Sequence, residues 1–260
     1  MELSNKTKLI ISVSSNPTNF GVTIYNHIFS KLNLNYLYLP FKTEEDKNVI
    51  NAIRTLNLVG CSVSSPLKSR MIAYMDNLDE NTKKLNNLNT IKNIDGKLHG
   101  FNTDYLGFKK LIENLNLGSA LIYGNGSVAK TILKVLNDLR FENIYLAGRN
   151  LKNIKKFSND NSVDIFDNQD IDLLINATPS GTDINNDDIL KYLEFCKIVI
   201  DLNVTKKDTL LVEQSMNKNL MVYKGSEMSI NQLREQFKIY TDILPNEELV
   251  EEALQLYLSN

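Results

Sequence analysis

The stretch LIYGNGSVAK, Leu121 to Lys130, joins an apolar run to a helix-like run through a short turn that contains two glycines. Gly124, Gly126 and Ala129 fit the pattern G-x-G-x-x-A, in which backbone N–H groups at a helix N-terminus approach the pyrophosphate of a dinucleotide. The pattern is weak alone, but a strand is expected before it, a helix after it, and a second strand, in NIYLAG, ends about 20 residues later. We therefore predict a dinucleotide site. Its expected contacts are Gly124, Asn125, Gly126, Ser127 and Val128.

The residues after that second strand indicate which dinucleotide is preferred. An NAD site usually has an acidic residue there, whereas this chain has Gly148, Arg149 and Asn150, followed by Lys152. An arginine can stack on adenine and pair with a 2′-phosphate, which a carboxylate would repel. The pattern favours NADP(H) over NAD(H), with Arg149, Asn150 and Lys152 as contacts. The alternative is that Arg149 is only a solvated residue after a strand.

Apolar runs alternate with helix-period segments along the chain. Strands are expected at LIISVS, LNYLYLP, LVGCSVS, SALIYG, ENIYLAG, DLLINA and KIVIDLN, and Asp95-Gly96, between NTIKNI and KLHGFN, is a two-residue hairpin signal. Helices are expected after most of these strands and over residues 226–240 and 247–258. Such alternation predicts parallel sheets with helices on both faces. Because the strands are too many for one sheet, we predict two α/β domains with a boundary near residues 103–118.

The composition excludes several classes of function. The chain has 260 residues, enough for a buried core, and its 42% hydrophobic and 23% charged residues are typical of globular proteins. A net charge of −2 gives no electrostatic case for nucleic acid, and no apolar run is long enough to span a membrane. Cys61, Cys196, His27 and His99 lack metal-ligand spacing. We expect a cytoplasmic protein with no metal and no nucleic-acid or membrane partner.

Two polar turns in the first half of the chain are candidates for chemistry. HGFNTDYLG, residues 99–107, places an Asn-Thr-Asp triplet that ends at Asp104 between a predicted strand and a predicted helix. Asp104 is either a helix N-cap or a group that faces a site and has a partner elsewhere. GCSVSSPLK, residues 60–68, has small hydroxyl residues, then a proline and Lys68. Lys68 alone could equally be a surface lysine that opens a helix.

The order of these turns resembles the shikimate dehydrogenase family. GCSVSSPLK is similar to the family pattern G-x-(N/S)-V-(T/S)-x-P-x-K, Leu88-Asn89-Thr90 to its N-T element, and GFNTDYLG to G-x-N-T-D-x-x-G. The dinucleotide turn then follows. DLLINATPSG at 172–181, Asp201-Leu202, and Gly225-Ser226-Glu227-Met228 with Gln232 resemble later family segments. Each motif is loose, but the ordered set, which spans about residues 10 to 240, is specific.

The resemblance implies an enzyme that interconverts 3-dehydroshikimate and shikimate with NADP(H). It implies two α/β domains flanking a cleft: a catalytic domain of residues 1–104 plus 236–260 and a Rossmann-type NADP-binding domain of residues 105–235. Lys68 and Asp104 would bracket the reacting hydroxyl as an acid/base pair. Substrate binding would involve Thr23, Ser64, Asn89, Asp104 and Gln232, and further cofactor contacts would be Thr178, Leu202, Gly225 and Met228. The partner would be a small-molecule substrate, and the chain a monomer or a homodimer.

The chain departs from the family mainly at substrate positions. The family has N-P followed by H-S-x-S-P, whose two hydroxyls hold the substrate carboxylate. After Asn16-Pro17 this chain has Gly21 and Thr23 at the two serine positions. Ser12-Val13-Ser14 also spells S-x-S, but it precedes Asn16-Pro17 and is expected inside a strand, so we do not assign it to the motif. The tyrosine of the family's D-x-x-Y segment is Val204 here.

These departures leave the substrate open. N-F-G-x-T resembles a divergent shikimate dehydrogenase-like branch, so the same chemistry on another hydroxy acid, such as quinate, is one alternative. A non-catalytic regulator that binds NADPH is another, although a regulator need not retain Lys68 and Asp104. If Gly21 and Val204 surround the substrate, Gly21→Ser with Val204→Tyr is expected to lower KM for shikimate.

Overall fold

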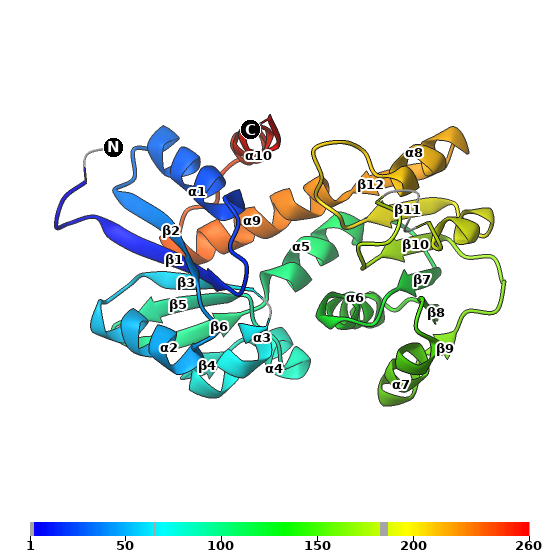
Figure 1. The fold of residues 1–260 in the computed structure, drawn as a ribbon, viewed down its shortest axis with the longest axis horizontal. Helices are drawn as coiled ribbons and strands as arrows, with labels where there is room; N and C mark the ends of the chain where they lie inside the picture. Colours follow the sequence, from blue (N-terminus) through cyan, green and yellow to red (C-terminus); the bar gives the residue numbers. More distant parts are fainter. Residues whose placement is uncertain (1–2, 65, 183–186, 260) are drawn as a thin grey trace. The chain divides into compact units, whose positions relative to one another are not determined.

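The computed structural model describes residues 3–64, 66–182 and 187–259. The chain divides into two compact units, Met1–Gly107 with Ile230–Asn260, and Phe108–Ser229. Each unit contains one six-stranded sheet with helices packed on it (Figure 1). The breaks follow residues 107 and 229, whereas the sequence predicted breaks after residues 104 and 235. The chain therefore leaves the first unit within α5 (Thr103–Ile112) and returns to it within α9 (Gly225–Thr241).

The first unit has a mixed sheet in the order β2-β1-β3-β5-β6-β4. Its strands are β1 (Lys8–Ser14), β2 (Tyr36–Lys42), β3 (Gly60–Val63), β4 (Asn77–Leu78), β5 (Thr90–Ile94) and β6 (Lys97–Phe101). Besides parts of α5 and α9, its helices are α1 (Phe20–Lys31), α2 (Asp46–Thr55), α3 (Leu67–Arg70), α4 (Glu80–Leu85) and α10 (Glu247–Ser259), with a 3-10 turn over Met71–Tyr74.

Part of this first sheet is antiparallel. Strand β1 pairs in parallel with β2 and β3, but β5 is antiparallel to both β3 and β6. The predicted hairpin joins β5 to β6, with Asp95 and Gly96 at φ 51° and 83°. The first sheet is therefore mixed, because the predicted two-residue hairpin can join only antiparallel strands.

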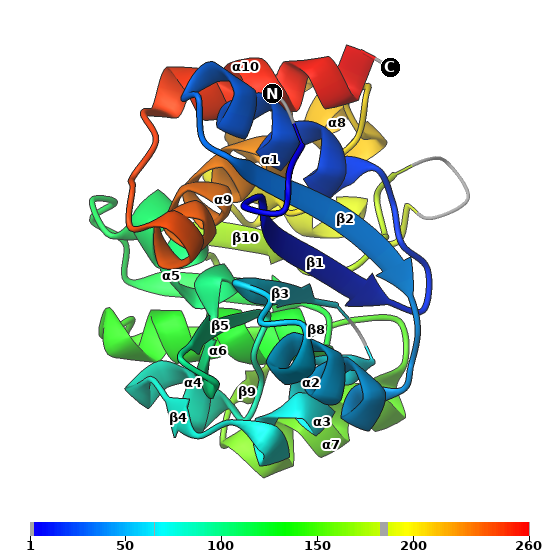
Figure 2. The same ribbon diagram turned by 90° about the vertical axis from the view of Figure 1, so that its left-hand side faces the viewer.

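Alternation along β1 separates two hydrophobic cores in the first unit. Ile10 lies in a core with residues of α1, α9 and α10, whereas Ile11 and Val13 lie in a core with residues of α2 and α3 (Figure 2). Ser12 and Ser14 continue the face of Ile10. The carboxyl end of β1 therefore directs hydroxyl groups to the side covered by α1 and α9.

The second unit is a parallel sheet in the order β12-β11-β10-β7-β8-β9. Its strands are β7 (Ser119–Tyr123), β8 (Asn143–Ala147), β9 (Asp164–Ile165), β10 (Leu173–Asn176), β11 (Ile198–Asp201) and β12 (Met221–Lys224). Its helices are α6 (Ser127–Asp138), α7 (Leu151–Asn161) and α8 (Leu210–Asn217), with a 3-10 helix over Leu190–Glu194. Counted from β7, this is the 3-2-1-4-5-6 order of the Rossmann fold, read from the opposite edge.

The long elements follow the sequence expectation, and the differences lie in short ones. Helix α8 and strand β12 were not expected, because eight and four residues carry little periodicity. The same holds for α4 and for the two-residue strands β4 and β9. Within the described ranges, no helix combines the length and the apolar character that crossing a membrane requires.

Candidate active site

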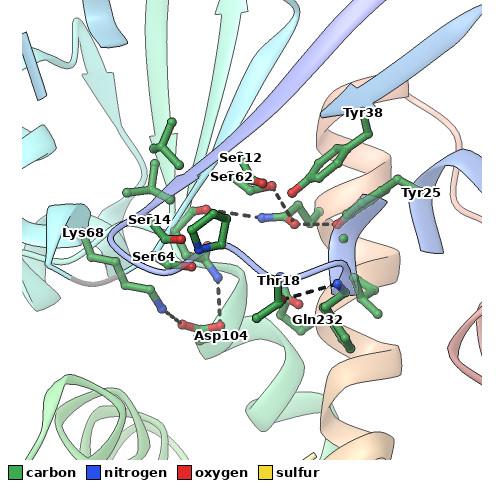
Figure 3. A pocket seen from close by; sticks show the side chains of 18 of the residues that line it. Ser12, Ser14, Thr18, Tyr25, Tyr38, Ser62, Ser64, Lys68, Asp104 and Gln232 are labelled. Atoms are coloured by element: carbon green, nitrogen blue, oxygen red, sulfur yellow. Dashed lines mark hydrogen bonds and ion pairs between the residues drawn. The ribbon is translucent and has the colours of Figure 1, made fainter. Parts of the chain in front are cut away.

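A pocket of about 440 Å³ lies in the first unit, on the face of the sheet that carries Ser12 and Ser14 (Figure 3). Strands β1 and β3 contribute the residues at their carboxyl ends, where ligands bind in parallel α/β sheets. Most of the predicted substrate and catalytic residues line this pocket: Ser64, Lys68, Asn89, Asp104 and Gln232.

Lys68 and Asp104 form an ion pair in this pocket. Nζ of Lys68 is 2.6 Å from Oδ2 of Asp104, and the two side chains are 16% and 18% exposed. Lys68 is the second residue of the short helix α3, and Asp104 is the second residue of α5. Both side chains are only partly buried, so each still has exposed surface that a small ligand can contact.

Asp104 is not the cap of α5. The N–H of Tyr105 donates to Oδ1 of Asn102 at 3.0 Å, so Asn102 caps the helix. Asn102 is 2% exposed, and its Nδ2 also donates to the carbonyl of Asn87 at 2.8 Å. With the cap supplied by Asn102, the Asp104 carboxylate is available to the pocket.

Asn89 fixes the second oxygen of that carboxylate. Its Nδ2 donates to Oδ1 of Asp104 at 2.8 Å, and its own Oδ1 accepts from the N–H of Thr103 at 2.9 Å. Gln232 of α9 donates from Nε2 to Oγ1 of Thr103 at 2.7 Å. α9 approaches closely because Gly107 has no side chain: a Cβ there would lie 2.8 Å from the Cβ of Gln232. The carboxylate of Asp104 is therefore held by Lys68 and Asn89, and α9 contacts the neighbouring Thr103.

The two positions that correspond to the family's serines, Gly21 and Thr23, differ in their relation to the pocket. Thr23, in the first turn of α1, is absent from the described residues that line the pocket, although Gly21 is present. A Cβ at Gly21 would lie 2.8 Å from both Cε1 and the hydroxyl oxygen of Tyr38. A serine at Gly21 would therefore have to displace the ring of Tyr38, which argues against the expected gain in shikimate binding from Gly21→Ser with Val204→Tyr.

Several residues that line the pocket were not predicted from the sequence. Ser12 and Ser14, which were not assigned to the serine motif, lie in β1 as expected and line the pocket. Tyr38 and Gln236, 3% and 4% exposed, line it as well. One signal was present: the letters SVSS occur at 12–15 and again at 62–65, each at the end of a predicted strand.

The second unit has the geometry of a pyrophosphate turn at β7 and α6. Gly124 has φ +128°, and a Cβ there would lie 2.7 Å from Cγ2 of Thr178, so only glycine fits. Gly126 precedes the first turn of α6, and a Cβ there would meet no atom within 4 Å. The open space beside Gly126 and the N–H groups of α6 fit a phosphate group.

The other predicted cofactor residues have separate places in this unit. Asn150 caps α7, since its Oδ1 accepts from the N–H of Asn153 at 3.1 Å. Leu202 and Gly225 lie side by side, because a Cβ at Gly225 would lie 2.6 Å from the carbonyl of Leu202. The remaining predicted residues are exposed or half-buried: Asn125, Ser127, Val128, Arg149, Lys152 and Met228.

Comparison with known proteins gives a match within the first unit and matches over nearly the whole chain. Residues 17–91 match the family model described as the shikimate dehydrogenase substrate binding domain. A shikimate dehydrogenase-like protein of Haemophilus influenzae is 28% identical, covering 96% of this chain and 97% of its own. A shikimate dehydrogenase (NADP(+)) of Methanosphaera stadtmanae is 32% identical, covering 98% and 99%. A solved shikimate dehydrogenase in complex with NADP+ is 28% identical, covers 100% of this chain and 98% of its own, and superposes with a TM-score of 0.88.

Proposed function

The chain belongs to the shikimate dehydrogenase family, and we propose that it is an NADP-dependent dehydrogenase that interconverts 3-dehydroshikimate and shikimate, or a close cyclic hydroxy acid and its ketone. The observation that carries the proposal is the ion pair between Lys68 Nζ and Asp104 Oδ2, at 2.6 Å, in the wall of the first unit's pocket. A regulator that only binds NADPH has no need of such a pair.

The Lys-Asp pair accounts for the proton in this reaction. When bound, the nicotinamide ring gives or accepts the hydride. In the direction of reduction, Lys68 Nζ donates a proton to the substrate's carbonyl oxygen as that oxygen gains negative charge, and in oxidation the same nitrogen takes the hydroxyl proton. Oδ2 of Asp104 holds the nitrogen in place, and the hydrogen bond from Asn89 Nδ2 to Oδ1 at 2.8 Å keeps the carboxylate oriented.

We assign substrate binding to the first unit and NADP(H) binding to the second. The match to a substrate binding domain over residues 17–91 supports the first assignment. The turn at Gly124 and Gly126, with the N-terminus of α6, supports the second, since backbone N–H groups there would hold the pyrophosphate. Arg149 and Lys152, both exposed after β8, would bind the 2′-phosphate.

A hydroxy acid other than shikimate is the second candidate substrate. Gly21 has no hydroxyl group at the first serine position of the family motif, and Thr23, at the second, does not line the pocket. A substrate with a shape different from that of shikimate, such as quinate, would suit a pocket whose carboxylate-binding groups differ from those of the family pattern.

A spectrophotometric screen tests both candidates. The purified full chain is incubated with shikimate, quinate and related acids, each with NADP+ and with NAD+, and Lys68→Ala is compared with the exposed-site variant Lys97→Ala. We expect NADP-linked turnover of one acid that Lys68→Ala abolishes and Lys97→Ala preserves. NADPH binding without turnover of any acid would instead support the regulator.

A further inference from the structure

We propose that the substrate carboxylate is bound by hydroxyl groups at the ends of β1 and β3 and on β2, and not by the first turn of α1. These groups form the hydroxyl patch: Ser12, Ser14, Ser62, Ser64 and Tyr38, all of which line the pocket. The inference rests on the proposed function, because it assumes a cyclic hydroxy acid whose reacting group meets Lys68 and Asp104.

Strand register places the four serines on one face. Ser12 and Ser62 are paired residues of the parallel strands β1 and β3. Because side chains alternate along a strand, Ser14, the last residue of β1, faces the same way as Ser12. Ser64 directly follows β3, where its N–H donates to the carbonyl of Val13 at 3.0 Å, and it lines the same pocket. In Figure 3, Ser12 lies with Ser62, whereas Ser14 lies with Ser64, nearer to Lys68 and Asp104. The patch therefore extends from the interior of the pocket toward the ion pair.

Tyr38 replaces the hydroxyl group that Gly21 lacks. Its hydroxyl points toward those of Ser12 and Ser62 (Figure 3), and burial raises the pKa of Tyr38 to about 12. The phenol therefore remains a neutral hydrogen-bond donor at any working pH. Since a side chain at Gly21 would collide with this ring, the glycine and the tyrosine act together to place a hydroxyl in the pocket from β2.

Some of these hydroxyls are held by the protein and others are free for a ligand. Ser62 Oγ donates to Oε1 of Gln236 at 3.2 Å and lies 2.8 Å from the hydroxyl of Tyr240. By contrast, the side chains of Ser14 and Ser64 form no hydrogen bond within the described ranges. The Ser62 hydroxyl is thus held by Gln236 and Tyr240, whereas the hydroxyls of Ser14 and Ser64 can donate hydrogen bonds to a ligand.

The charges of the pocket point to the carboxylate as the group bound there. Lys68 and Asp104 are the charged residues among its described lining, and they neutralise each other. The reacting hydroxyl occupies that pair, so the carboxylate of the same molecule must be met elsewhere by neutral donors. Hydroxyl groups form strong, charge-assisted hydrogen bonds with carboxylates, and the patch supplies several on one face.

The test compares Ser14→Ala, the hydroxyl-preserving Ser14→Thr, Tyr38→Phe and Thr23→Ala on the substrate found by the screen. Loss of one hydroxyl from a bound carboxylate should raise KM about 5- to 150-fold. We expect this rise for Ser14→Ala and Tyr38→Phe, with little change in kcat or NADPH affinity, and recovery in Ser14→Thr. Thr23→Ala should be unchanged. The uncharged methyl ester of the substrate should be far less sensitive to Ser14→Ala than the acid, which a general packing defect would not produce.

Two results would overturn the inference in different ways. If the unmutated protein is active and Ser14→Ala keeps its KM while Thr23→Ala raises it, the carboxylate is bound at α1 and the proposed function stands. If the unmutated protein turns over no hydroxy acid with NADP+, both proposals are wrong. Thermal unfolding of each variant identifies a Tyr38→Phe protein that has lost its fold, and Ser14→Ala then decides alone.

Discussion

Asn102, Thr103 and Asp104 are consecutive residues with three different tasks. Asn102 caps α5, Thr103 is buried between Asn89 and Gln232, and Asp104 contacts Lys68. Asparagine and aspartate cap helices about equally well, so residue type alone does not distinguish them. What distinguishes them is the direction in which each side chain leaves the start of α5.

Lys68→Ala tests the chemical half of this division. Removing general acid-base help typically lowers the rate about 10²- to 10⁴-fold, so we expect kcat to fall by that order. NADPH affinity, measured by fluorescence titration, should be nearly unchanged. Because Lys68 and Asp104 act as one unit, the double variant with Asp104→Asn should be little worse than the single variants. A drop in kcat that multiplied across the two changes would argue for independent roles.

Asn102→Ala tests the structural half. Loss of an N-cap costs about 0.5–2 kcal/mol, which urea unfolding should detect, whereas kcat of the folded protein should change far less than in Lys68→Ala. Asp104→Asn should show the reverse: an unfolding free energy close to that of the unmutated chain and a reduced kcat. The opposite assignment of effects would mean that Asp104 is the cap.

Arg149→Asp tests the choice of cofactor. A carboxylate at the end of β8 would repel the 2′-phosphate that an arginine attracts. We expect a much larger loss of affinity for NADPH than for NADH, measured by fluorescence titration of each. A variant that lost both affinities in equal proportion would place Arg149 outside the phosphate site.

At the scale of elements, the turn between β7 and α6 combines two glycines with different roles. Gly124 is required by its backbone, because φ +128° is unfavourable for other residues and Thr178 leaves no room for a Cβ. A Cβ at Gly126 would meet no atom of the protein within 4 Å. The lack of a side chain there therefore matters for a ligand that approaches the turn.

Gly124→Ala and Gly126→Ala therefore form a matched pair. We expect Gly124→Ala to lower the free energy of unfolding by about 1–3 kcal/mol, because it adds backbone strain and a collision with Thr178. Gly126→Ala should leave stability within about 0.5 kcal/mol and weaken NADPH binding. Urea unfolding and NADPH titration measure the two effects. Equal loss of stability in both variants would contradict the assignment.

At the scale of the whole molecule, each unit has its own core and sheet. In the second unit, Asp172 contributes to stability in acid. The ion pair with Lys197, followed by hydrogen bonds from the N–H groups of Gly118 and Ser119, lowers the pKa of Asp172 from 3.8 to about 2. Asp172 thereby ties the start of β7 to the segments before β10 and β11.

The sign of this contribution follows from the lowered pKa. The ionised carboxylate stabilises the folded chain above pH 3.8, and its contribution is lost as the pH falls through about 2. We expect Asp172→Asn to be less stable than the unmutated chain near neutral pH, and the difference to shrink below pH 4. Urea unfolding at a series of pH values measures it. A difference that is constant with pH would show that charge is not involved.

Local patterns in the sequence were sufficient for much of the fold. The glycine turn at Leu121–Lys130, the two alternating series of strands and helices, and the Asp95-Gly96 hairpin each depend on neighbouring residues, so they are readable before any tertiary contact is known. The ordered motifs around Lys68 and Asp104 identified the family. The short elements α8 and β12 were missed because so few residues carry no clear period.

Tertiary structure alone decided which residues line the pocket. Ser12 and Ser14 were set aside because they lie within a strand, yet the register of β1 with β3 turns them toward the pocket. The place of Gly21 was decided by Tyr38, a residue of β2 that lies 17 positions away in the sequence. Thr23 has the right chemistry but is not among the described residues that line the pocket. Side-chain chemistry and local period follow from the sequence by itself, but a binding surface is assembled from several strands and helices, and its members are chosen by their packing.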